Sequence, residues 1–143
     1  MLLADVNVFV YAHRPDSPRH DQMRDWLAQV LAGDEPFGVS EAVLASFVRI
    51  VTHHRVFRDP TPPEVALEFC AAVLAAPATV PVRPGARHWA LFDQLCRTVG
   101  ARGNIVPDAF LAALAIEQGA TWMTTDPGFA RFPGLRWQLP PGY

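Results

Sequence analysis

Short apolar segments of strand length alternate with longer segments in which apolar residues recur every three or four positions. The strand-like segments are residues 2–6, 36–39, 79–82, 120–124 and 135–139. Helical spacing occurs between them, in segments that begin at Ser17-Pro18, Ser40, Thr61, residue 86 and Pro107. Strands that alternate with helices form parallel sheets, because each parallel pair needs a crossover connection. We therefore predict an α/β sandwich with a mostly parallel sheet.

Several helix boundaries carry local signals. Ser17 precedes a proline, Ser40 precedes an amphipathic segment, and Thr61-Pro62-Pro63-Glu64 has the form of a capping box. Gly33 and Gly119 follow the last apolar residues of two helices, where glycine commonly ends a helix. The apolar residues 8–12, after the first strand, are consistent with either a loop or a helix start.

The chain has the length and composition of one domain, residues 1–143. Half of the residues are hydrophobic and 18% are charged, so a large core can form. We expect a cytoplasmic protein, because no signal segment opens the chain and no apolar run is long enough to span a membrane. Cys70 and Cys96 lie in helix-like segments, and we expect both to be reduced thiols.

Four acidic residues lie near predicted strand ends. Asp5 falls inside the first apolar segment, Asp126 follows residues 120–124, and Asp108 and Glu41 lie in the first turns of two helices. Ligands of open α/β sheets bind beyond the carboxyl ends of the strands. Singly, Asp108 and Glu41 could complement a helix dipole and Asp126 could form a turn. Asp5 is harder to explain, because burial of a carboxylate is costly unless it is compensated.

Taken together, these carboxylates predict a cation site. Several carboxylates at one sheet edge repel each other and need a counter-charge. An oxygen-only ligand set favours Mg²⁺ or Mn²⁺, which can activate water and neutralise charge on a phosphodiester. The net charge of −2 argues against a basic nucleic-acid coat, but it leaves room for a nucleic-acid enzyme whose site is made attractive by a bound cation.

Four motifs resemble those of the PIN-domain family. Leu3-Ala4-Asp5-Val6-Asn7-Val8 is similar to the first family motif, and Gly103-Asn104-Ile105-Val106-Pro107-Asp108 resembles the third. Thr124-Thr125-Asp126-Pro127-Gly128-Phe129 resembles the fourth, in which a threonine or serine stands two residues before the acid. Residues 43–52 are similar to a branch of VapC toxins. The motifs occur in order over nearly the whole chain.

The resemblance implies a three-layer α/β/α sandwich and assigns the metal site to Asp5, Asp108 and Asp126. Asn7, Asn104 and Thr125 are then supporting polar groups. The chain departs from the family at its second acid, whose register is occupied here by Ser46. Glu41 is the nearby carboxylate, and we expect it to act as the substitute. Arg49, Arg102 and Arg131 are candidate contacts to RNA phosphates.

The implied function is that of a Mg²⁺- or Mn²⁺-dependent endoribonuclease toxin, which cleaves single-stranded regions of RNA. The same resemblance implies a VapB-type antitoxin and a homodimer as partners. A catalytically inactive PIN domain that binds RNA or protein is the alternative, because the second acid is displaced. A phosphoryl-binding receiver domain is disfavoured, since such folds use a lysine and all twelve basic residues here are arginines.

Histidines and tryptophans add little to this assignment. The adjacent His53 and His54 point in different directions from a helix end, and we do not expect them to bind metal. Trp26, Trp89, Trp122 and Trp137 occupy core-like positions in the pattern, so we expect most of them to be buried rather than to stack on bases.

Overall fold

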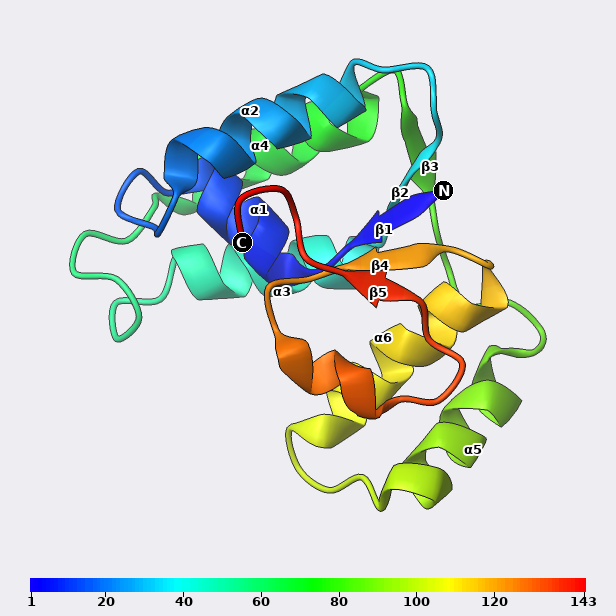
Figure 1. Cartoon of the computed structure of the whole chain (residues 1–143). Helices are drawn as coiled ribbons and strands as arrows, with labels where there is room; N and C mark the ends of the chain where they lie inside the picture. Colours follow the sequence, from blue (N-terminus) through cyan, green and yellow to red (C-terminus); the bar gives the residue numbers. More distant parts are fainter.

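A computed structural model describes all 143 residues and has a five-stranded parallel sheet at its centre (Figure 1). The strand order is β3-β2-β1-β4-β5, and every neighbouring pair is parallel. The strands are β1 (Leu2–Ala4), β2 (Phe37–Val39), β3 (Thr79–Pro81), β4 (Thr121–Met123) and β5 (Trp137–Gln138). All five lie within the predicted segments, and β5 lies at one edge of the sheet.

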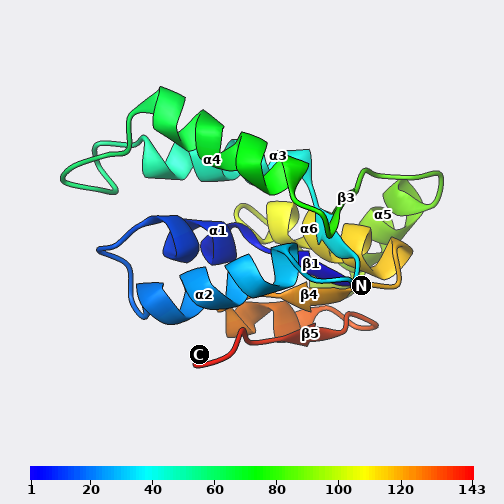
Figure 2. The same ribbon diagram turned by 90° about the horizontal axis from the view of Figure 1, so that it is seen from above.

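Helices cover both faces of the sheet, which gives the expected α/β/α sandwich (Figures 1 and 2). One layer holds α1 (Val6–His13), α2 (His20–Leu31), α3 (Glu41–Val51) and α4 (Pro63–Ala75). The other holds α5 (His88–Val99), α6 (Ile105–Glu117) and the short 3-10 helix η1 (Pro127–Arg131). The crossover from β3 to β4 carries α5 and α6 past two strands, so β1 and β4 become neighbours at the centre.

Several helix starts differ from the sequence prediction. The apolar residues 8–12 belong to α1, which Asp5 caps, so this segment is a helix and not a loop. The capping-box prediction at Thr61 is wrong, because α4 is preceded by Pro62 and the Thr61 hydroxyl bonds instead to Arg14. Ser40 precedes α3 but forms no side-chain cap.

Two further boundaries are shifted by local backbone geometry. The helix predicted from Ser17-Pro18 begins at His20, after Arg19 adopts a left-handed φ of 50°. The helix predicted from Pro107 begins two residues earlier, at Ile105. Ser17-Pro18 and Pro107 thus lie close to the helix starts, but neither marks the first helical residue.

The core is a single cluster of 30 buried apolar residues packed on both faces of the sheet. Trp122 is fully buried there, whereas Trp89 is 69% exposed, so the expected core position is wrong for Trp89. Both cysteines are free thiols. None of the helices has the length and apolar character required to cross a membrane.

Candidate active site

The carboxyl ends of β1 and β4 meet at the centre of the sheet, because Ala4 pairs with Met123 in the parallel register. Asp5 follows β1 directly, and its backbone N–H donates to the carbonyl of Met123 over 2.9 Å. Its Oδ1 accepts a 2.7 Å bond from the N–H of Val6, which caps α1. The strand-to-helix junction therefore holds the Asp5 carboxyl group at the sheet edge.

Asp5 is only 5% exposed, and its second oxygen is also bound. The Thr124 hydroxyl donates to Oδ2 over 2.6 Å, and Nδ2 of Asn7 donates to the same oxygen over 3.1 Å. Burial raises the pKa of Asp5 to about 6; the bonds from Thr124 and Val6 oppose this rise, and the charges of Asp108 and Asp126 add to it. The site thus holds a carboxylate whose ionised form is costly without a cation.

Thr124 links the two strand ends. It is fully buried, and its Oγ1 accepts bonds from the backbone N–H of Asp126 over 3.0 Å and from Nδ2 of Asn7 over 3.3 Å. We expected Thr125 to supply this polar group, but Thr125 contributes only its backbone N–H, which donates to Oδ1 of Asn7 over 3.3 Å. The spacing of the fourth motif, with a threonine two residues before the acid, already indicated Thr124.

Asp126 and Asp108 approach the same edge from η1 and α6. The Asp126 carboxylate accepts a 2.7 Å bond from the N–H of Gly128 and caps η1. Asp108 is half-buried in the first turn of α6, and burial followed by the charge of Asp126 raises its pKa. Each of these charges therefore acts on another, so the three aspartates form one electrostatic cluster.

Arg131 is the cation that the structure places at this cluster. Its charge acts against the rise in the pKa of Asp108, and its Nε donates to the carbonyl of Gly128 over 2.8 Å. Arg49 and Arg102 are exposed, one near the end of α3 and the other in the loop before α6. Asn104 is exposed beside that loop and makes no side-chain cap on α6. Only Arg131 among the three arginines is thus brought to the aspartates.

Glu41 is directed away from the cluster. Its carboxylate is 56% exposed and forms a 2.7 Å ion pair with Arg83. The charge of Glu41 does not contribute to the raised pKa of Asp5 or to that of Asp108. Ser46 is half-buried and lines an apolar pocket instead. The geometry therefore gives no support to the expectation that Glu41 replaces the second acid.

The chemistry of the donor set suits a hard divalent cation, since carboxylate, amide and hydroxyl oxygens surround the strand ends. No three histidine, cysteine or carboxylate groups converge closely enough to hold a metal ion in direct contact. Mg²⁺ does not require such convergence, because it keeps several waters and binds proteins through one or two carboxylates. The three aspartates thus fit a hydrated ion.

Comparison with known proteins finds relatives that match nearly the whole chain. A PIN-domain family model matches residues 2–135. The chain is 51% identical over 140 residues to the VapC ribonuclease Mb2897 of Mycobacterium bovis, covering 98% of this chain and 95% of the relative. Ribonuclease VapC43 of Mycobacterium tuberculosis matches with the same identity and coverage, 51% over 140 residues.

A solved structure shares the fold. The crystal structure of VapBC2 from Rickettsia felis, bound to a DNA fragment from the promoter, superposes with a TM-score of 0.71. The match is 22% identical and covers 96% of this chain and 97% of that one. The chain therefore belongs to the PIN-domain family and, within it, to the VapC ribonucleases.

Proposed function

We propose that the protein is a Mg²⁺- or Mn²⁺-dependent endoribonuclease toxin that cuts single-stranded regions of RNA. The observation that carries the proposal is the buried Asp5 carboxyl group, which shares the carboxyl ends of β1 and β4 with Asp108 and Asp126. Unstacked bases in single-stranded regions are the accessible part of an RNA, which favours them as the target.

The three aspartates have different tasks in this proposal. Asp5, Asp108 and Asp126 would hold the ion, which supplies a more acidic water and neutralises charge on the phosphodiester. Both oxygens of Asp5 are already in hydrogen bonds, so this residue is a fixed anchor. Asp108, half-buried in the first turn of α6 beside Asp126, would in addition take the proton from the attacking water. Arg131 would bind a phosphate oxygen.

A VapB-type antitoxin and a second copy of the chain are the proposed protein partners. The structural neighbour from Rickettsia felis is itself a VapBC assembly. Val65, Leu67 and Leu74 are exposed apolar side chains on α4 that would be available to such contacts. The alternative function, an inactive binding module, gains support from Glu41, which is directed to Arg83 and away from the aspartates.

Cleavage of total RNA by the purified protein separates the two functions. We expect discrete fragments with Mg²⁺ or Mn²⁺, and no fragments in EDTA or with the Asp5→Asn variant. Folded protein free of antitoxin that leaves RNA intact with both metals would establish the binding module instead.

Glu41→Gln is expected to change the cleavage rate less than about threefold, because an exposed ion pair contributes little. Arg83→Gln is the matched control, since it removes the other half of the same pair. Both variants should behave alike in the RNA assay. A hundredfold loss in Glu41→Gln alone would show that Glu41 leaves Arg83 and joins the site during catalysis.

Thr124→Val is expected to slow cleavage about tenfold at neutral pH and to raise the pH at which activity appears. The hydroxyl stabilises the ionised form of Asp5, so its loss moves the pKa of Asp5 further above 6. Thr125→Val is the control, because Thr125 contributes only its backbone. A pH profile of cleavage that is identical in the two variants would contradict the role of Thr124.

A further inference from the structure

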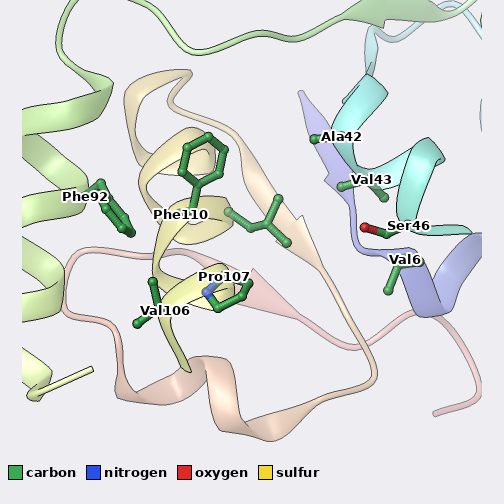
Figure 3. Close-up of a pocket in the computed structure, with 9 residues that line it drawn as sticks. Val6, Ala42, Val43, Ser46, Phe92, Val106, Pro107 and Phe110 are labelled. Carbon is green, nitrogen blue, oxygen red and sulfur yellow. The ribbon is translucent and has the colours of Figure 1, made fainter. Parts of the chain in front are cut away.

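An apolar pocket of about 300 Å³ lies between α6 and the helices α1 and α3 (Figure 3). Phe92, Val106 and Phe110 form one side, and Val6, Val43 and Ser46 face them. The volume is at the lower end of the range for small-molecule pockets. A compact group with apolar faces therefore fits this space better than a helix.

Two residues that line the pocket are sequence neighbours of the candidate active-site aspartates. Val6 follows Asp5 in the chain, and Pro107, which also lines the pocket, precedes Asp108. A polymer whose phosphate lies at these aspartates would therefore place its neighbouring group at the pocket. This adjacency is what distinguishes the pocket from the other depressions of the surface.

Aromatic rings extend from the pocket to the surface. The rings of Phe92 and Phe110 lie 5.8 Å apart, and Trp89 lies 5.2 Å from Phe92 while remaining 69% exposed. Buried His88 lies parallel to Phe92 and bonds to the carbonyl of Phe110 over 2.9 Å. His88 thus fixes the rings of Phe92 and Phe110 in position. The exposed ring of Trp89 is available to a ligand.

Ser46 is the polar side chain of the pocket, and its hydroxyl is turned toward the opposite wall in Figure 3. A serine hydroxyl is neutral and can donate or accept one hydrogen bond. The pocket therefore offers apolar walls, aromatic edges and one adaptable polar group.

We propose that this pocket binds one unstacked base beside the cleaved phosphodiester of RNA, and that Trp89 stacks on a neighbouring base. This inference rests on the proposed ribonuclease function, and it identifies a base beside the cleaved bond as the part of the substrate that the protein recognises. A base is uncharged, presents two apolar faces to the apolar walls, and carries edge groups that can bond to the Ser46 hydroxyl. Base stacking on aromatic side chains is a common source of affinity for single strands.

The test measures binding without metal, so that it does not depend on cleavage. Fluorescence anisotropy in EDTA compares a short labelled single-stranded RNA with a ribose-phosphate chain of the same length that lacks bases. We expect the RNA to bind roughly 5- to 100-fold more tightly, which is the range for stacking of one base. Tryptophan fluorescence should be quenched by the RNA and not by the chain without bases.

Two variants and two controls locate the effect. Ser46→Leu fills the pocket, and Ala45→Leu adds the same bulk to the neighbouring, exposed position of α3. Trp89→Ala removes the exposed ring, and Val56→Ala removes an exposed apolar side chain from the loop after α3. We expect Ser46→Leu and Trp89→Ala to lose most of the preference for RNA, and both controls to keep it.

Three outcomes overturn the inference. Equal binding of RNA and of the chain without bases would do so, as would a preference that survives in Ser46→Leu. A change of oligomeric state or of antitoxin binding in Ser46→Leu, with unchanged RNA binding, would assign the pocket to a protein partner. Failure of the ribonuclease proposal looks different, because base-dependent binding would persist while total RNA remained uncut with both metals.

Discussion

Replacement of Asp5 by asparagine is expected to reduce RNA cleavage about a thousandfold and, at pH 8, to increase the free energy of unfolding. Catalysis is lost because the anchoring carboxylate of the proposed metal site is removed. Stability rises because the ionised carboxylate is buried beside two other acids. Asparagine keeps the cap of α1, since it is as good an N-cap as aspartate.

The pH dependence gives the sign of the stability effect. Burial raises the pKa of Asp5 from 3.8 to about 6, so the folded state holds the proton more tightly than the unfolded state. The resulting stability is fully present below pH 3.8 and is lost as pH rises through 6. The shift corresponds to roughly 3 kcal/mol, from which the loss of the acceptor for the Thr124 hydroxyl and for Nδ2 of Asn7 subtracts. We therefore expect a net gain of about 1–3 kcal/mol at pH 8.

Urea unfolding of both proteins between pH 4 and pH 8, without divalent metal, checks this prediction. The wild-type protein should lose stability across that interval more steeply than the variant. Asp25→Asn serves as the control, because Asp25 is exposed on α2 and pairs with Arg24. An Asp5→Asn protein that fails to fold would show that Asp5 is a structural residue. Parallel pH profiles of the free energy of unfolding would show that burial of the ionised Asp5 carboxylate does not destabilise the fold.

The order and type of the main elements could be predicted because the spacing of the apolar residues differs between strands and helices. The strands have only two or three residues and lie within short, mostly apolar segments, and the helices that cover them show the i, i+3, i+4 pattern. α1 was ambiguous, since it is buried on most sides and the pattern of an amphipathic helix is absent there. Capping hydroxyls were misleading, because Thr61 is used by a tertiary contact to Arg14 instead.

The aspartates of the site could be predicted, but their neighbours required tertiary information. A carboxyl group inside an apolar segment needs compensation, which drew attention to Asp5. Which threonine compensates it depends on the side of β4 that faces α1, and only Thr124 points there. The orientation of the Glu41 side chain depends on whether its carboxylate joins the aspartates or pairs with Arg83. Arg83 is 42 residues away in the sequence. Trp89 has the helical spacing of a core residue, but its side chain is exposed on α5.

Arg14→Leu is expected to lower the free energy of unfolding by about 3 kcal/mol, the largest destabilisation we predict for a single polar side chain. Arg14 is 8% exposed and joins α1 to the loop before α4. Its guanidinium forms a two-pronged pair with Asp16, with bonds of 2.8 and 2.6 Å. It also donates to the Asp59 carbonyl over 2.8 Å and lies 4.1 Å from the ring centroid of Phe57.

The loss comes mainly from the groups left behind. Leucine fills part of the space, but the buried Thr61 hydroxyl and the Asp59 carbonyl each lose a donor. Arg14→Lys should recover only part of the stability, because an ammonium group cannot reproduce the planar fork toward Asp16. Urea unfolding at neutral pH measures both variants.

Arg24→Leu is the matched control, because Arg24 also pairs with two aspartates, Asp21 and Asp25, yet is 52% exposed. Exposed pairs contribute little to stability, so we expect the free energy of unfolding of this variant to stay close to that of the wild type. If Arg14→Leu and Arg24→Leu were equally mild, burial would not be what gives Arg14 its weight. If Arg14→Leu unfolded the chain while Arg24→Leu did not, the connection between α1 and the loop before α4 would be essential to the helical layer that contains the proposed anchor at Asp5.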